Sequence, residues 1–327
     1  MQIIGIDVSK EKLDCLWLRN VDTGKVKTKV FQNTAKDHLQ LIEWSLKHTG
    51  LAIDQVHFVM EATGIYHEAL AYALYQAGAR VSVVNPAQVR DYAKGIAART
   101  KTDKKDSFVL ARFGIAESPR LWHPEAEEIR VLKALLARYN ALQKDIQREL
   151  NRREKAHISC VSREVLQSID TVVAQLDDEA KRVDALISDH INQNPSLKND
   201  RQLLESIPAV GPVISQYMMS VINSRDFRSA AQCAAYLGLN PVQHESGCSV
   251  RGRSHLSKAG SSIVRAKLYM AAVVAIRYNP DVKHLYERLL KRGKSTMSAL
   301  CAAMRKLVHI CFGVLKHQTP YQAQCVL

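Results

Sequence analysis

The chain lacks several features that would assign it to common protein classes. Its seven cysteines are scattered and form no CxxC pair, which argues against a disulfide framework and against a zinc site. No two histidines have the HxxxH spacing of helical metal ligands. The N-terminus lacks the basic and then apolar pattern of a signal peptide, and we expect no apolar run to be long enough to span a membrane. These absences predict a cytoplasmic protein without a membrane partner.

Acidic residues are too few to balance the basic ones. The 327 residues include 46 Lys and Arg against 32 Asp and Glu, which gives a formal net charge of +14. Such an excess favours a polyanionic partner, and nucleic acid is the commonest of these. The plainer alternatives are an anionic membrane surface or a generally basic protein. The length predicts roughly two or three domains.

Strand-like and helical patterns alternate through residues 1–124. An apolar run at Ile3–Val8 is followed by two strand-like runs around the turn Asp22-Thr23-Gly24. A helical pattern, the strand VHFVMEATG, a second helix and the strand VSVVNPAQV come next. This order predicts a ribonuclease-H-like α/β domain, a mixed sheet with helices on its faces, in which the first and fourth strands are neighbours.

Two carboxylates fall on those neighbouring strands. Asp7 lies in the buried first strand, where an uncompensated charge is costly. Glu61 ends the fourth strand, so the two side chains would face each other and share a cation or a proton. The plainer interpretation of Asp7 is a strand-end residue bound to local backbone. We interpret Asp14 as a residue on the surface of its strand.

Two more acids open a helix in KTDKKDSFVLARFG. Asp103 and Asp106 are three residues apart and therefore share one helix face. Acids in a first turn are also what the helix dipole favours, which is a strong alternative explanation. Four carboxylates in this set would suit Mg²⁺ or Mn²⁺. Lys101, Lys104 and Lys105 keep the segment electropositive and are candidate contacts for nucleic acid.

No glycine occurs between residues 115 and 210. Apolar residues recur there in steps of three and four, which predicts an antiparallel coiled-coil arm over residues 125–198 with its turn at His157–Cys160. A dimerisation arm and an intramolecular spacer explain this pattern equally well.

Residues 199–327 are expected to form a mostly helical domain. A short helix at Asn199–Ser206 leads into IPAVGPVIS, which resembles a helix-hairpin-helix element. The hairpin amides near Gly211 and the start of the next helix would hold backbone phosphate. A glycine turn between packed helices, without any ligand, is the alternative.

A polar, basic loop follows in HESGCSVRGRSHLSKAG, residues 244–260. Arg251, Arg253 and Lys258 could hold phosphate, which is the common use of such loops. One of its serines could instead be a nucleophile toward a phosphodiester. The serines at 246, 249, 254 and 257 are all available, so this chemistry alone does not choose among them.

Nearly end to end, the chain resembles the DEDD-type transposases of the insertion-sequence family numbered one hundred and ten, which include bridge-RNA-guided recombinases and pilin-gene invertases. The segments that carry the resemblance, in the family's order, are IGIDVSKEKLD, MEATGIYHEALA, VVNPAQVRDYAK, RTKTDKKDSFVLARF, LLESIPAVGPVIS, YLGLNPVQHESGCSVRG and SKAGSSIVRAKLYMAA. The resemblance implies transposition by DNA recombination, with a RuvC-like N-terminal domain and a C-terminal transposase domain.

The resemblance also implies roles for individual residues. The family's four acids fall on Asp7, Glu61, Asp103 and Asp106, which would hold magnesium. Its serine, in an E-S-G motif, falls on Ser246 and would form a covalent phosphoserine link to DNA. The residue after that glycine is often serine or lysine and here is Cys248, which puts in doubt any contact made at that position.

The partners implied by the resemblance are donor DNA, target DNA and a noncoding bridge RNA that pairs with both. Homodimers would assemble into a homotetramer, with the acids of one protomer meeting the serine of another and a Holliday junction as intermediate. Such a protein would be associated with the nucleoid. A metal-dependent nuclease or junction resolvase without a covalent serine is the alternative, and a non-catalytic scaffold for nucleic acid is a third hypothesis.

Overall fold

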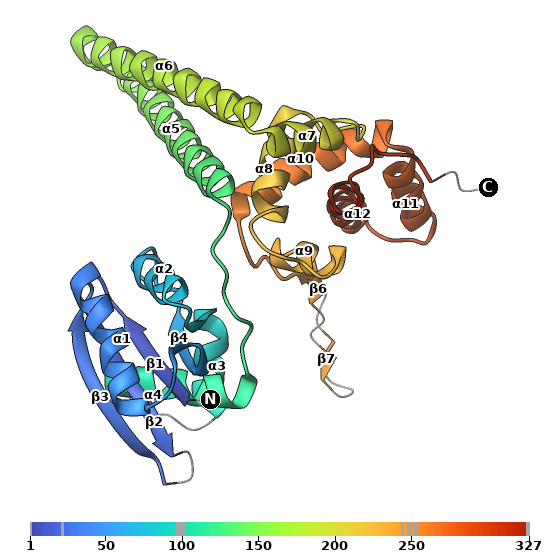
Figure 1. The fold of residues 1–327 in the computed structure, drawn as a ribbon. Helices are drawn as coiled ribbons and strands as arrows, with labels where there is room; N and C mark the ends of the chain where they lie inside the picture. The colour runs from blue at the N-terminus through green and yellow to red at the C-terminus, as the bar shows by residue number, and fades with distance from the viewer. Residues whose placement is uncertain are drawn as a thin grey trace. The chain divides into compact units, whose positions relative to one another are not determined.

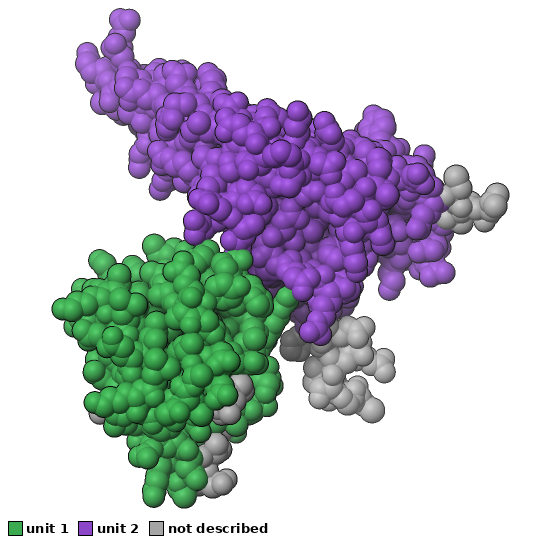
Figure 2. Space-filling view, in the orientation of Figure 1, with its two compact units in different colours: residues 1–124 green, residues 125–327 purple. Residues whose placement is uncertain are grey.

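The computed structural model describes residues 2–20, 23–95, 103–242, 245–246, 250–251 and 254–324. Lys101 and Arg253, singled out above, lie outside the described residues. For Asp103, Lys104, Ser246 and Arg251 the backbone alone is described. The chain forms two compact units, residues 1–124 and residues 125–327 (Figure 2).

Unit 1 contains a five-stranded mixed sheet in the order β3-β2-β1-β4-β5. Strands β1 (Gln2–Val8), β2 (Lys12–Asn20) and β3 (Lys25–Gln32) form an antiparallel meander, while β4 (Val56–Glu61) and β5 (Arg80–Val84) run parallel to β1. The predicted mixed sheet and the adjacency of its first and fourth strands are therefore confirmed.

Helices cover both faces of this sheet (Figure 1). The helices of unit 1 are α1 (Ala35–Thr49), α2 (Glu68–Gln76), α3 (Pro86–Gly95) and α4 (Asp103–Glu117). Alternate residues of each strand point to opposite faces. Ile4 and Ile6 pack in a core with α1 and α2, whereas Ile3 packs in a second core with α3 and α4. Two separate cores explain why β1 reads as an almost continuous apolar run.

In unit 2, α5 (Glu127–Ile158) and α6 (Arg163–Gln193) form an antiparallel pair (Figure 1). Arg153 Nε and Asp170 Oδ1 lie 2.7 Å apart between the two helices. The turn covers residues 159–162, two residues later than predicted, because α5 continues through His157 to Ile158. Cys160 then takes a left-handed conformation with φ 49°.

One continuous core joins this helix pair to the remaining helices of unit 2. These are α7 (Pro195–Glu205), α8 (Pro212–Ile222), α9 (Ala230–Tyr236), α10 (Ser262–Tyr278), α11 (Pro280–Lys291) and α12 (Thr296–His317). Leu132 and Leu142 of α5 and Ile187 of α6 are fully buried in it. The predicted boundary at residue 198 stays a prediction, since residues 125–327 form one compact unit.

Helix α12 is an exception to the expectation that no apolar run is long enough to span a membrane. Within the described residues it is the one helix whose length and mean hydropathy, 1.5, would allow it to cross a membrane. However, 56% of its most apolar window is buried inside the protein. A core helix of a folded domain has these same properties, so α12 is weak support for a membrane span.

Candidate active site

Asp7 and Glu61 lie at matching positions on neighbouring strands. In the parallel ladder between β1 and β4, Gly5 pairs with Val59 and Ile6 with Met60. The next residues along the two strands are Asp7 and Glu61, and both are half-buried. Registered residues of parallel strands point to the same face. The two carboxylates therefore share the sheet face that α4 covers.

Helix α4 runs close to that face because Gly5 has no side chain. A Cβ at Gly5 would lie 2.1 Å from the carbonyl oxygen of Ser107 and 2.6 Å from the amide nitrogen of Ala111. Further along α4, Gly114 contacts Ile3, so the helix is antiparallel to β1. The first turn of α4, with Asp103 and Asp106, is consequently directed toward the Asp7 end of the strand.

Asp14 is a further acid on this face, and the interpretation of it as a surface residue is wrong. It is the register partner of Asp7 on β2 and is only 8% exposed. Lys12 Nζ lies 3.1 Å from its Oδ2, which compensates the buried charge. The segment KLDCLWLRN has apolar residues at positions that point to both faces of β2. This pattern is the sequence signal that both faces of the strand are covered.

The donor set at this edge of the sheet consists of hard carboxylate oxygens, which fit Mg²⁺ or Mn²⁺. Within the described side chains, which leave out Asp103, no three His, Cys, Asp or Glu residues are close enough together to hold an ion. Strand register and the contact of α4 with Gly5 bring Asp7, Glu61 and the start of α4 to one edge of the sheet.

Ser246 lies on a narrow ribbon of short strands rather than in the open loop that was predicted. Strands β6 (Pro241–Val242) and β9 (His255–Leu256) form one antiparallel pair, and β7 (Glu245–Ser246) and β8 (Val250–Arg251) form another. Glu245 pairs with Arg251, and Ser246 pairs with Val250. The ribbon extends away from the helices of unit 2 (Figure 1).

Two glycines allow the chain segments at the base of this ribbon to touch. Gly238 and Gly260 both have φ +73°, a left-handed conformation that favours glycine. A Cβ on Gly238 would lie 2.2 Å from the carbonyl oxygen of Ala259, and a Cβ on Gly260 would lie 2.2 Å from that of Tyr236. Backbone packing against backbone fixes where the ribbon leaves the helices.

Arg265 joins the same two segments through hydrogen bonds. Its Nη1 donates to the carbonyl oxygens of Ala259 at 2.5 Å, Gly260 at 3.0 Å and Leu237 at 3.3 Å. Lys258, a predicted phosphate contact, is exposed at this base, and its amide donates to the carbonyl of Gly238 at 3.3 Å. The role of Arg265 was not predicted, because one of its partners, Leu237, lies 28 residues before it in the chain.

The segment that resembles a helix-hairpin-helix element forms α7, a short turn and α8. Gly211 is the N-cap of α8 in an extended conformation, φ −100° and ψ −173°, and the left-handed residue of the hairpin is Ala209 at φ 78°. Ser215 Oγ donates to Glu205 Oε1 at 3.1 Å. A carboxylate therefore lies near the first turn of α8, where it would compete with a phosphate.

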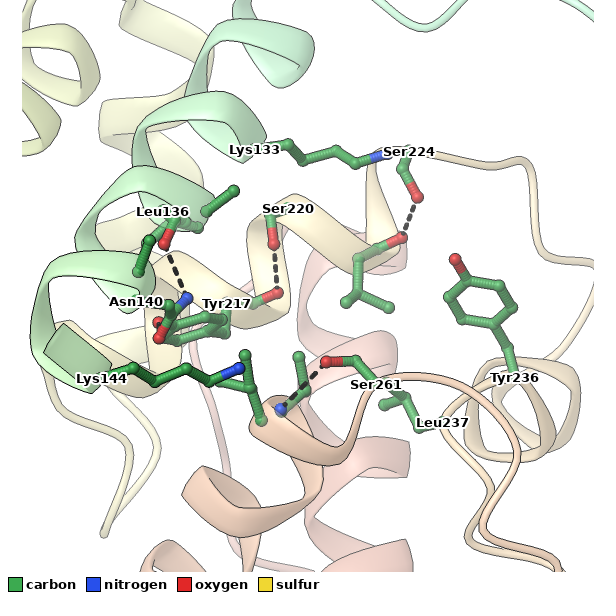
Figure 3. Close-up of a pocket in the computed structure, with 15 residues that line it drawn as sticks. Lys133, Leu136, Asn140, Lys144, Tyr217, Ser220, Ser224, Tyr236, Leu237 and Ser261 are labelled. Atoms are coloured by element: carbon green, nitrogen blue, oxygen red, sulfur yellow. Dashed lines mark hydrogen bonds between the residues drawn. The ribbon is translucent and has the colours of Figure 1, made fainter. Parts of the chain in front are cut away.

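Unit 2 also contains a cavity of about 400 Å³ between α5, α8, α9 and α10 (Figure 3). Lys133 and Lys144 line it, together with Tyr217, whose hydroxyl donates to Asn140 Oδ1 at 2.7 Å. Burial raises the pKa of Tyr217, and the hydrogen bond to Asn140 opposes this effect. Most of the other lining residues are apolar or small, so the cavity is chemically unlike the acidic sheet edge.

Comparison with known proteins places both units among transposases. Residues 4–156 match a family described as "Transposase", of the DEDD type of IS110, and residues 201–287 match the "Transposase IS116/IS110/IS902 family". The pilin gene-inverting protein of Moraxella lacunata is 32% identical over 321 residues, covering 97% of each chain. The matched segments contain all four predicted metal ligands and Ser246.

Two further similarities are weaker. An uncharacterized 43.6 kDa protein of insertion element IS110 from Streptomyces coelicolor is 24% identical over 161 residues, covering 49% of this chain and 38% of that protein. The solved structure of T. thermophilus RuvC in complex with a Holliday junction substrate covers 37% of this chain and 100% of its own, at 14% identity and a TM-score of 0.26. That score is too low to support a conclusion about the fold.

Proposed function

Because this chain belongs to the IS110 family of DEDD transposases, we propose that it cuts DNA strands and exchanges them between a donor and a target. The observation that carries the proposal is the shared sheet face of Asp7 and Glu61, toward which the first turn of α4 is directed. Acids brought to one edge from three separate elements are typical of a RuvC-like nuclease site. The excess of positive charge, +14, suits contact with several nucleic-acid strands.

The acids would hold the metal in this proposal. Asp7, Glu61, Asp103 and Asp106 provide carboxylate oxygens for Mg²⁺ or Mn²⁺. When bound, the ion supplies positive charge that offsets the charge of the phosphate under attack. The half-buried positions of Asp7 and Glu61 favour this role, since two carboxylates on adjacent strands are stabilised by a cation between them.

Ser246 is the proposed nucleophile. Its hydroxyl loses a proton, its oxygen bonds to phosphorus, and the bond from phosphorus to one bridging oxygen of the strand breaks. The leaving oxygen takes a proton and becomes a strand-end hydroxyl. Attack by the hydroxyl of a new strand end reverses these steps, releases Ser246 and completes the exchange. The position of Ser246 on a ribbon that extends from unit 2 would allow it to reach a site on another protomer.

We further propose that a noncoding bridge RNA selects the sites by pairing with donor and target DNA, so that the protein contacts backbone and RNA shape. Homodimers would assemble into a homotetramer in which acids and serine come from different protomers. The pair α5 and α6 would hold partner domains at the required separation. RNA recovered with the protein from its host, sequenced and then added to recombination assays, tests the guide.

The serine is tested by one substitution and one matched control. With RNA, DNA and Mg²⁺ present, Ser246→Ala is expected to abolish a protein–DNA adduct that resists denaturation. Ser254→Ala, which changes another exposed serine of the ribbon, should keep the adduct. An adduct that survives Ser246→Ala excludes the covalent serine mechanism.

The acids are tested on a labelled duplex. Asp103→Asn and Asp106→Asn should each stop strand cutting while RNA binding is unchanged. Cutting that persists in both variants rules out the four-acid site. Metal-dependent cutting without any adduct would indicate the alternative, a RuvC-like nuclease or junction resolvase. No product from the wild-type protein under all these conditions would favour a nucleic-acid scaffold.

A further inference from the structure

We propose that five basic residues on unit 1 bind the phosphate backbone of a nucleic-acid duplex, on the sheet face opposite the carboxylates. This basic patch consists of Arg19, Lys25, Lys27, Lys29 and Lys47. The proposed binding rests on the proposed function only in that nucleic acid is the ligand. The basic patch would be a second contact surface, away from the site of cutting.

Strand register places the patch on the α1 side of the sheet. Lys27 pairs with Trp17, and Lys29 pairs with Cys15. Trp17 and Cys15 both point into the core beneath α1 and α2. Lys25 follows the same alternation on β3. The side chains of the acids point to the other face, so one bound strand segment cannot contact both sets across the sheet.

Aromatic rings support the patch from below. Lys29 Nζ lies 4.6 Å from the centre of the Phe31 ring, and Arg19 Cζ lies 5.3 Å from that of Trp17. Arg19 lies two residues after Trp17 on β2 and so follows the same face, next to the irregular β2–β3 register between Leu18 and Asn20. Contact with a ring face orders the charged end of each side chain before a ligand binds, which lowers the entropic cost of binding.

Helix α1 adds its last turn to the patch. Lys27 Nζ lies 3.2 Å from Nδ1 of His48, and the adjacent Lys47 is exposed. The pKa of His48 is lowered from its ordinary value, first by loss of contact with water and then by Lys27, Lys47, Lys29 and Arg19. The four cations are therefore close enough together to act on one imidazole.

No carboxylate within the described residues forms an ion pair with any member of the patch. Glu43, one turn before Lys47 on α1, makes no such contact either. Unpaired cations repel one another, so their gathering on three elements is unfavourable for folding and is stabilised by an anion.

The lysines of β3 also have a simpler use, because charged residues on an edge strand discourage pairing with other sheets. That use does not explain Arg19 or Lys47, which lie on β2 and α1. Alternate residues of a strand are ~7 Å apart, so the three lysines form a row along the sheet edge. A row of cations matches a repeating phosphate backbone better than it matches a single small anion.

The test measures equilibrium binding of the full chain to labelled DNA and RNA duplexes of equal length. Binding is measured by fluorescence anisotropy in the presence of EDTA. The variant Lys29→Gln/Lys47→Gln removes two exposed charges of the patch. The control Lys94→Gln/Lys181→Gln removes two exposed lysines that are paired with Asp91 at 3.2 Å and with Asp177 at 2.7 Å. The net charge of both variants is the same.

At ~0.1 M salt we expect the patch variant to bind at least one duplex roughly tenfold more weakly than the control does. The slope of log affinity against log salt for DNA should fall by about 0.9 for each lost phosphate contact. Loss with one duplex alone identifies DNA or RNA as the ligand, and loss with both identifies the shared backbone.

Equal affinities of the patch variant and the control for both duplexes would overturn the proposal. The proposal is also overturned if the patch variant only aggregates more readily, because that result supports the explanation that the lysines protect an edge strand. Arg19→Gln/Lys25→Gln, a second pair from the same patch, should reproduce the loss. Since the assay needs no cutting, its result is independent of the adduct and cleavage tests of the proposed function.

Discussion

The close contact between α4 and β1 makes Gly5→Ala the most informative single substitution in unit 1. The added Cβ would lie 2.1 Å from the carbonyl oxygen of Ser107 and 2.6 Å from the amide nitrogen of Ala111, against an ordinary contact distance of 3.4 Å or more. Both atoms belong to helix backbone, so no side chain can rotate away. The helix and strand would have to separate by at least about 1.3 Å.

This displacement should change both stability and activity. Overpacking of a core typically costs 1–3 kcal/mol, and we expect Gly5→Ala to lower the free energy of unfolding by about 3 kcal/mol. Helix α4 carries Asp103 and Asp106, so its movement also displaces two proposed ligands. Misplacement by ~1 Å can reduce a rate by ~100-fold. We therefore expect a loss of DNA cutting of this size in the protein that remains folded.

Gly114→Ala is the matched control on the same helix. Its Cβ would lie 2.7 Å from Val59 Cγ2 and 3.1 Å from Ile3 Cγ2, which are methyl groups of buried side chains and not backbone, so a shift of about 0.7 Å relieves the contact. Replacing a glycine inside a helix also gains up to ~1 kcal/mol of helix propensity. The two effects oppose each other, so the free energy of unfolding should fall by about 1 kcal/mol, less than for Gly5→Ala, and cutting should persist.

Urea unfolding and the cutting rate at saturating DNA measure both variants. If Gly5→Ala is as stable and as active as the wild type, α4 does not lie against β1 as described. The convergence of the acids at the sheet edge would then be wrong.

Three further substitutions test separate parts of the molecule. Gly313, inside α12, has open space where a Cβ would be, so Gly313→Ala should raise the free energy of unfolding by about 0.5–1 kcal/mol in urea titrations; a decrease would show that the site is occupied. Burial, followed by the charge of Arg80, lowers the pKa of His57 from 6.5 to about 4. The unfolded chain thus binds the proton more tightly, and stability should fall as the pH is lowered from 6.5 to about 4. His57→Gln should flatten that part of a plot of stability against pH, and an unchanged slope would assign it to other groups. Arg265→Lys keeps the charge, but its nitrogen is one bond closer to the backbone than Nη1 and does not reach the three carbonyl groups at the ribbon base, so we expect a loss of ~2 kcal/mol together with weaker adduct formation. Full stability and full adduct yield in this variant would show that Arg265 does not position the ribbon.

Several predictions from the sequence depended on local patterns, and these agree with the structure. An apolar run and two strand-like runs around a turn predicted β1, β2 and β3, and helical spacing predicted α1 and α2. The order of strands and helices limited the sheet to a few topologies, which is why the adjacency of β1 and β4 could be predicted.

Other features were decided by contacts between residues far apart in the chain. The burial of Asp14 depends on whether α4 covers β2, and the approach of α4 depends on the absence of a side chain at Gly5. Likewise, Arg265 of α10 reaches the carbonyl oxygen of Leu237, which lies 28 residues earlier in the chain. The residue pattern by itself therefore determined which segments are strands and helices and which residue types can bind metal. Only the tertiary structure decided which of them lie on one face, because burial and close packing are properties of pairs of surfaces.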